Sequence, residues 1–160
     1  MALAIIPKSG SQSMRRVLRQ YKEIPAEEVR GFDTRVAFIR HPVARLGSAF
    51  RFFHWLMIDG VKCDKTAPPK SVLNEWPKFV DYALENDNPH WRSQISFISD
   101  DSGMVANRLH KFENVGRCWE EYYQGILPWI NATSKVPYAD YRVDDINRFY
   151  KADLELWHGL

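Results

Sequence analysis

Short apolar runs alternate with segments of helical periodicity in the first part of the chain. Leu3-Ala4-Ile5-Ile6 is a run typical of a buried strand, and Arg35 to Ile39 is rich in β-branched and aromatic residues. Between these runs, apolar residues recur with the spacing of one helix face, at Met14, Val17, Leu18 and Tyr21. The pattern therefore predicts a strand, a helix and a second strand.

A second helical stripe begins at Pro42, a residue suited to the first turn of a helix. Its apolar positions are Val43, Leu46, Phe50, Phe53 and Met57. The later pattern predicts a breaker-rich loop over residues 59–71, a helix over 77–85, a strand over 105–112, a helix capped by Asn114 and a terminal helix capped by Asp144 that runs to Trp157. Alternating strands and helices predict an α/β fold with a parallel sheet.

The composition fits one globular domain over residues 1–160. The chain has 160 residues, of which 45% are hydrophobic, enough for one core and too many for a disordered chain. No window reaches the ~18 uninterrupted apolar residues of a membrane span, and Pro7-Lys8 ends the first apolar run too early for a signal sequence. We therefore expect a cytoplasmic protein with no membrane partner. Cys63 and Cys118 have no metal-binding spacing, and we expect them to be reduced.

The small net charge of +2 hides an uneven distribution of charge. Residues 1–55 contain ten Lys and Arg against four Asp and Glu, whereas the remainder contains twelve against sixteen. A basic segment in a nearly neutral chain favours a localised anion site over a surface that coats nucleic acid, although a solvated basic face has the same composition.

One candidate anion site is the turn after the first predicted strand. Lys8, Ser9, Gly10, Ser11 and Ser13 stand where a strand ends and a helix begins, and backbone N–H groups at a helix start favour an anion. A Walker loop has its lysine after the second glycine, but here the lysine precedes Gly10. An ordinary capped turn is the alternative interpretation.

A second candidate follows the second predicted strand. Arg40 lies at its carboxyl end, the edge at which open α/β sheets bind ligands, and can present a bidentate fork to a phosphate. Ser48 falls on the polar side of the next helix, within one turn of Arg45. Arg45 could contact a ligand or cap a nearby carboxylate, and the whole unit could equally be structural.

Together these segments resemble the sulfotransferase family. Lys8-Ser9-Gly10-Ser11-Gln12-Ser13 is similar to the family's 5′-phosphosulfate loop, and Arg40-His41-Pro42 with Ser48 is similar to its 3′-phosphate motif. His90-Trp91-Arg92-Ser93-Gln94 and Lys111-Phe112-Glu113-Asn114-Val115-Gly116 resemble the carbohydrate sulfotransferase branch, which includes enzymes that sulfate chondroitin-type glycans. The resemblance extends in order over residues 3–157.

The resemblance implies a three-layer fold like that of P-loop kinases, with a central parallel sheet flanked by helices. It implies that the donor is 3′-phosphoadenosine 5′-phosphosulfate (PAPS), that the product is 3′-phosphoadenosine 5′-phosphate (PAP), and that no metal takes part. Lys8 would contact the 5′-phosphosulfate and the bridging oxygen as a catalytic residue, with Ser9, Gly10, Ser11, Gln12 and Ser13 as further donors. Arg40 and Ser48 would hold the 3′-phosphate. The acceptor would be a hydroxyl, on a carbohydrate or a small molecule.

Removal of the acceptor proton needs a general base, and several residues are candidates. His90 leads because it lies in a matching motif and a neutral imidazole suits the task, although a structural histidine is an equal alternative. His54, Glu113 and the acidic residues Glu23, Glu27 and Glu28 are the others.

Two further functions stay open. One is a nucleotide-binding module of the same fold that has lost transfer activity, which the short interval between Lys8 and Arg40 makes credible. The other is a small P-loop-like kinase, which the position of Lys8 and the absence of a carboxylate cluster for magnesium disfavour.

Overall fold

The computed structural model describes residues 2–4, 6–9, 14, 26–58, 66–123 and 140–160. Its elements are β1 (Ala2–Ala4), α2 (Ala26–Val29), β2 (Arg35–Ile39), α3 (Pro42–Ile58), η1 (Lys70–Val72), α4 (Trp76–Glu85), η2 (Ile95–Phe97), β3 (Ser99–Asp100), β4 (Gly103–Met104), β5 (Arg108–Lys111), η3 (Phe112–Asn114), α5 (Val115–Tyr123), α6 (Val143–Phe149) and α7 (Lys151–His158). Within these ranges, every helix is too short or too polar to cross a membrane.

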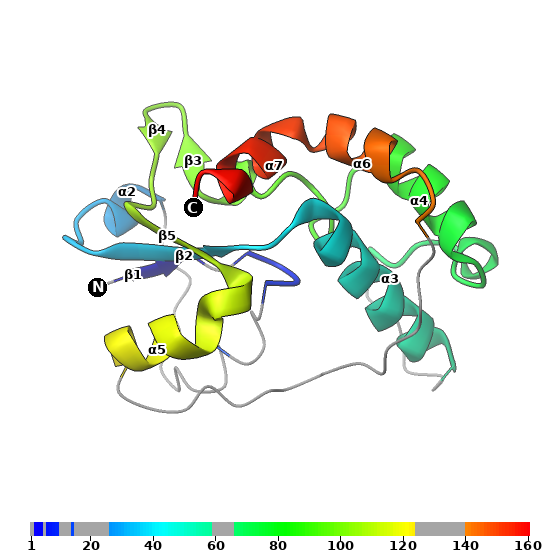
Figure 1. Cartoon of the computed structure of the whole chain (residues 1–160), viewed down its shortest axis with the longest axis horizontal. Coiled ribbons are helices and arrows are strands. Elements are labelled where there is room, and N and C mark those ends of the chain that lie inside the picture. The colour runs from blue at the N-terminus through cyan, green and yellow to red at the C-terminus, as the bar shows by residue number, and fades with distance from the viewer. Residues whose placement is uncertain (1, 5, 10–13, 15–25, 59–65, 124–139) are drawn as a thin grey trace.

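A small parallel sheet organises one part of the molecule (Figure 1). In the described residues its order is β1-β2-β5, with Leu3 paired to Val36 and Ala37 paired to Leu109. Since the strands run parallel, their carboxyl ends share one edge, and β2 leads from that edge directly into α3. The expectation of a mixed α/β fold with a parallel sheet flanked by helices is confirmed.

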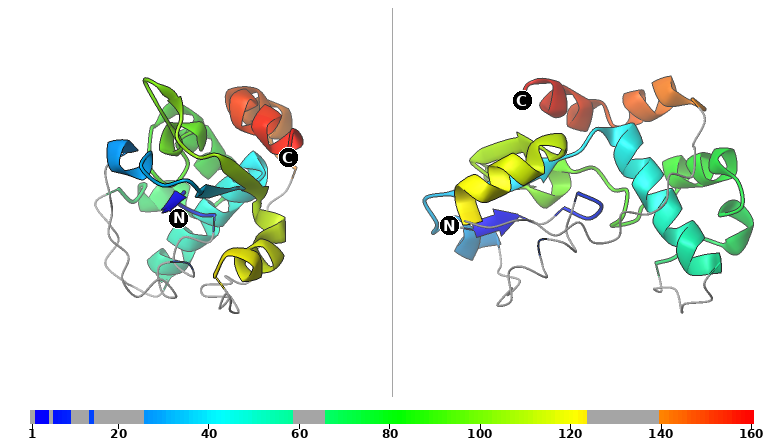
Figure 2. Two further views of the ribbon diagram at one scale, coloured as in Figure 1. Left: turned by 90° about the vertical axis from the view of Figure 1, so that its left-hand side faces the viewer. Right: turned by 60° about the horizontal axis from the view of Figure 1, so that its bottom comes forward.

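Both faces of β2 are buried, as its apolar composition requires. Val36 and Phe38 point to one face and pack with residues of α5, including Trp119. Ala37 and Ile39 point to the other face, where Ile98 and the partly buried Leu156 of α7 cover them. The sheet accordingly lies between α5 and α7, as the two views of Figure 2 show.

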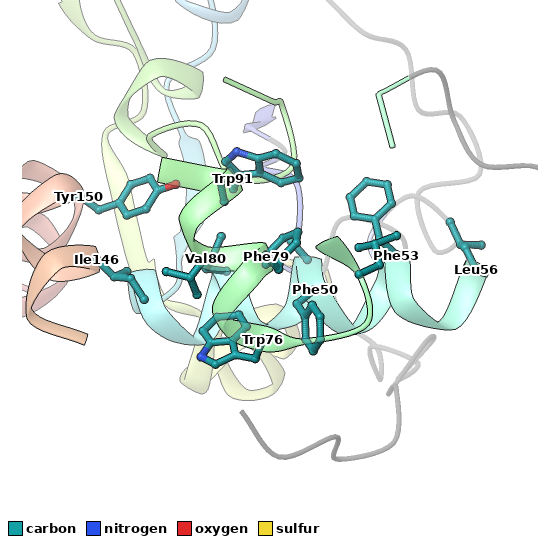
Figure 3. Close-up of a cluster of buried hydrophobic side chains, with 13 residues drawn as sticks. Phe50, Phe53, Leu56, Trp76, Phe79, Val80, Trp91, Ile146 and Tyr150 are labelled. Atoms are coloured by element: carbon teal, nitrogen blue, oxygen red, sulfur yellow. The ribbon is translucent and has the colours of Figure 1, made fainter. Parts of the chain in front are cut away.

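A second core forms where α3 continues beyond the sheet. Phe50 and Phe53 of α3 meet Phe79 of α4, and the rings of Phe50 and Phe79 have centroids 5.3 Å apart. Trp91 contacts Phe79 edge-on, and Ile146 of α6 closes the cluster (Figure 3). This packing fixes α3 at the carboxyl edge of the sheet, where the candidate site residues gather.

Several predicted elements agree with the structure. β2 has the predicted bounds, α3 begins at the predicted Pro42, and α4 begins one residue before the predicted start. Leu46, Phe50 and Phe53 are buried, and Val43 and Met57 pack at the edge of the same core. α5 begins directly after Asn114, as predicted.

Other predicted elements differ from the structure. The predicted terminal helix is two helices that meet at Tyr150, and α6 begins at Val143, so Asp144 lies in its first turn and is not its cap. The predicted strand over 105–112 shortens to Arg108–Lys111, because the N–H of Val105 bonds instead to the carbonyl of Ile98 (2.7 Å). Apart from the buried Met14, the predicted helix at 14–21 lies outside the described residues.

Candidate functional site

The two segments predicted to bind an anion lie side by side at the carboxyl edge of the sheet. The turn at Pro7–Ser9 follows β1, and Arg40 follows β2, the strand paired with β1. The Nη1 of Arg40 donates a hydrogen bond to the main-chain carbonyl of Lys8 at 3.0 Å. The structure therefore brings together residues that are 32 positions apart in the sequence. Gly10, Ser11, Gln12 and Ser13 lie outside the described residues.

The turn has an unusual backbone at Lys8. Lys8 has a φ of 66°, in the left-handed region that residues with a Cβ seldom adopt. The N–H of Ser9 donates to the carbonyl of Ile6 at 3.2 Å and closes the turn. Ser9 itself is buried, with its hydroxyl 3.4 Å from the Oε1 of Gln94. Strained residues of this kind are frequent at ligand-binding sites and persist where the surroundings hold them.

The ammonium group of Lys8 lies over the ring of Phe52, with Nζ 3.8 Å from the ring centroid. Burial, together with the positive charges of Arg40, Arg45 and Arg51, lowers the pKa of Lys8 from 10.5 to about 7. Four basic side chains thus converge on this edge of the sheet. Their mutual repulsion gives the site an affinity for a group of opposite charge.

Arg45 holds the site together through main-chain carbonyls. It is buried, with 2% of its surface exposed, and burial lowers the pKa of its guanidinium to about 10. It donates from Nε to the carbonyl of Pro7 (2.9 Å) and from Nη1 to that of Arg92 (2.6 Å), and its Nη2 lies 3.5 Å from that of Pro89. These hydrogen bonds join α3 to the turn and to the segment at 89–92. Of the two roles considered for Arg45, the nearby carboxylate of Asp153 is consistent with the carboxylate partner.

Ser48 lies on the face of α3 that meets the turn. It is half-buried, three residues after Arg45 and four before Phe52, and in a helix these spacings put all three on one face. Arg45 contacts Pro7 and Phe52 contacts Lys8, so Ser48 lies between two residues that touch the turn. The assignment of Ser48 to the 3′-phosphate stays a prediction.

Gln94 links the two anion-binding segments. Its Oε1 accepts the N–H of Arg40 (2.9 Å), and its Nε2 donates to the carbonyl of the same residue (2.7 Å). The hydroxyl of Ser9 points to the same Oε1. Gln94 is fully buried, and its own N–H donates to the carboxylate of Asp153 at 2.7 Å.

The imidazole ring of His90 contacts Phe52, whose ring also lies beneath the ammonium group of Lys8. The imidazole stacks on Phe52 (centroids 5.6 Å apart, planes 23° apart) and meets Phe53 edge-on at 4.9 Å. The main-chain N–H of His90 donates a hydrogen bond to the Oδ1 of Asn88. Phe52 is thus common to both predicted catalytic residues, Lys8 and His90.

The other candidate bases lie in different surroundings. The Nδ1 of His54 donates to the carbonyl of Leu73 at 2.8 Å, a structural contact. Glu113 is exposed, and its Oε2 accepts the indole N–H of Trp157 at 3.3 Å. Glu28 is exposed on α2, which lies toward the amino end of β2 and so away from the site (Figure 1). Glu23 and the side chain of Glu27 are outside the described residues.

Three residues of this arrangement were not singled out from the sequence: Phe52, Gln94 and Asp153. Phe52 falls beside the apolar stripe of α3, and Asp153 has the appearance of a solvated residue of an amphipathic helix, yet it is 1% exposed. Gln94 stands in the motif that also contains His90, and that position was the available signal. Within the described ranges, no group of three or more His, Cys, Asp or Glu forms a metal-binding cluster.

Comparisons with known proteins add no relative. No protein-family model matches the chain, and no significant match is found among curated proteins or solved structures.

Proposed function

We propose that this protein is a PAPS-dependent sulfotransferase that transfers a sulfuryl group to an acceptor hydroxyl. The proposal includes the finer assignment of the fold to the three-layer, P-loop-kinase-like class. It combines the ordered motifs at Lys8, Arg40 and His90 with their positions in the structure. The donor carries negative charge at both ends, so its binding needs two groups of cations held at one place.

The observation that carries the proposal is the hydrogen bond from Arg40 to the carbonyl of Lys8. Had the two motifs lain on opposite sides of the molecule, one nucleotide could not have reached both. Their contact at one sheet edge, where open α/β sheets bind ligands, supports a shared site. The convergence of Arg40, Arg45 and Arg51 on Lys8 supports an anionic ligand.

Each side chain would have a separate task. Lys8 would stabilise the negative charge that grows on the bridging oxygen, and Ser9 would help to fix the turn around that group. Arg40 and Ser48 would hold the 3′-phosphate, which distinguishes PAPS from ATP. In the transfer, the bond from the acceptor oxygen to sulfur forms as the bond from sulfur to the bridging oxygen breaks, and PAP leaves.

His90 is the proposed general base, which takes the proton from the acceptor hydroxyl. Its contact with Phe52, the residue beneath Lys8, supports this choice over His54, which bonds to Leu73, and over Glu28, which is remote. The acceptor is proposed to be a hydroxyl of a carbohydrate, as in the branch that the motifs resemble.

Ligand-dependent thermal stability tests the proposal. PAP without magnesium should raise the midpoint of unfolding, because a ligand that binds the native state stabilises it. Arg40→Ala should abolish the shift, whereas the exposed control Arg117→Ala should retain it. A shift with magnesium-ATP and none with PAP would contradict the proposal and favour a kinase.

Transfer is tested separately from binding. Incubation with labelled PAPS and a panel of glycans and small alcohols should yield a labelled sulfate ester. Binding of PAP without label transfer to any acceptor would favour a nucleotide-binding module.

A further inference from the structure

The side chain of Gln94 occupies a central place between the two halves of the proposed site. The side-chain amide of Gln94 accepts a hydrogen bond from the main-chain N–H of Arg40 and donates one to its carbonyl. It therefore fixes the peptide groups on both sides of Arg40. Its Oε1 also receives the hydroxyl of Ser9 from the neighbouring turn. Because Gln94 is fully buried, removal of its amide would take a hydrogen-bond partner from the main chain of Arg40 and from the hydroxyl of Ser9.

The position of Gln94 is itself set by α7. The carboxylate of Asp153 accepts the N–H of Gln94 (2.7 Å), the N–H of Ile95 (3.1 Å) and the hydroxyl of Ser93 (2.7 Å). Asp153 is 1% exposed, so its charge is stabilised by these three donors and by the nearby Arg45. A buried carboxylate with three fixed donors has little freedom to move. The chain of contacts therefore extends from α7 through Gln94 to both Arg40 and Ser9.

We infer that Gln94 is a positioning residue, held in place by Asp153, that keeps the Lys8–Ser9 turn and Arg40 in one arrangement. The inference deepens the proposed function, since it identifies the group that makes the two ends of the site act together on one ligand. Gln94 does not touch the ligand itself. Its effect on binding and turnover passes through Arg40 and through the turn.

The first test needs no ligand. Titration of the Lys8 ammonium, followed by NMR of ¹³C-labelled lysine and assigned with Lys8→Arg, should give a midpoint near the pKa of about 7. In Gln94→Ala the midpoint should rise by about one pH unit or more, because the turn and Arg40 can then move apart, which hydrates the Lys8 ammonium and reduces the repulsion by Arg40. Ser96→Ala is the matched control, since it removes an exposed hydrogen bond to the main-chain carbonyl of Ser93 and leaves the contacts of Gln94 and Asp153 in place. Its midpoint should equal that of the wild type.

A role in stability alone predicts a different result. Gln94→Ala would then lower the midpoint of thermal unfolding but leave the Lys8 titration of the folded protein unchanged, which would overturn the inference. If the alanine variant does not fold, Gln94→Asn replaces it, because the shorter amide cannot reach both groups of Arg40. The midpoint of the Lys8 titration should rise in this variant as well. Failure of both variants to fold would also decide for a purely structural role.

Calorimetric titration with PAP separates this inference from the proposed function. If the wild type binds PAP, Gln94→Ala should weaken its binding about tenfold or more, and Ser96→Ala should not. If the wild type does not bind PAP, the proposed function fails, and the Lys8 titration still decides whether Gln94 positions the turn.

Discussion

The Nζ of Lys8 lies 3.8 Å from the centre of the Phe52 ring, within the range of a cation–π contact. The aromatic face supports the charge, while burial and three neighbouring arginines oppose it. Lys8 therefore gains or loses its proton near neutral pH, and a bound anion next to it would raise its pKa.

Anion binding should become weaker as the pH rises above 7. The pKa of Lys8 is about 7 in the free protein, and a bound anion would raise it, so binding at pH 8 must take up a proton. The affinity for PAP should then fall by up to about tenfold per pH unit. Calorimetry at pH 8 in buffers of different ionisation enthalpy should show proton uptake.

The variant Lys8→Met should abolish this proton uptake, and Lys70→Met, which changes an exposed lysine, should preserve it. Uptake that persists in Lys8→Met would assign the titrating group to another residue.

Conformational stability should increase with pH above 7. An unfolded lysine keeps its proton up to about pH 10.5, whereas folded Lys8 loses it near 7, so in this window the unfolded state binds more protons. The free energy of unfolding from urea titrations should therefore rise between pH 7 and pH 10. Lys8→Met should flatten this dependence and stabilise the protein at pH 6 by about 0.5–2 kcal/mol. A steeper dependence in the variant would refute the assignment.

Arg45→Ala should strongly destabilise the protein. The substitution removes two hydrogen bonds from a charged donor, to the main-chain carbonyls at positions 7 and 92, at a cost of about 1.5–3 kcal/mol each. Arg45→Lys should recover little of the loss, because one ammonium cannot reproduce the planar fork of the guanidinium. Urea unfolding measures both effects. Arg117→Ala, an exposed arginine on α5, should change stability by less than about 0.5 kcal/mol.

Two phenylalanines test the second core. Phe79 is fully buried between α3 and Trp91, so Phe79→Ala should cost about 3–5 kcal/mol. Phe149 is 58% exposed on α6, and the same substitution there should have an effect within about 0.5 kcal/mol. Thermal unfolding of the pair would check the packing. Equal losses at both positions would be incompatible with the observed burial.

His90→Ala should separate catalysis from nucleotide binding. Loss of a general base lowers kcat by about 10²–10⁴, and the affinity for PAP should stay the same because the proposed donor contacts come from Lys8, Arg40 and Ser48, whereas the ring of His90 packs on Phe52 and Phe53. Transfer of labelled sulfate at saturating donor gives kcat, and calorimetry gives the affinity. A full rate in His90→Ala would exclude it as the base.

The elements with clear local patterns were predictable. β2 has apolar residues on both faces, and α3 has a long apolar stripe behind a proline, so composition and periodicity define them without knowledge of their neighbours. The same local information predicted that Lys8 and Arg40 would follow the strands β1 and β2. Parallel pairing of these strands then brings the two residues to one edge.

Features that depend on distant partners were not predictable. Tyr150 continues the apolar stripe of the terminal helix, so the sequence gives no sign that the helix breaks there. Asp153 owes its burial to donors at positions 93–95, which no local pattern reveals. Trp76 and Trp91 lie outside the elements predicted from the sequence, yet both are buried in the core.

Arg45 recognises main-chain oxygen atoms at positions 7, 89 and 92, and every amino acid supplies such an oxygen. The side chains at 89 and 92 can therefore be exchanged without loss of these contacts, and both are exposed. Positions 89 and 92, which flank His90, are thus two positions where side chains can be varied while Arg45 holds the main chain of the loop. Libraries randomised there should retain a high proportion of folded members.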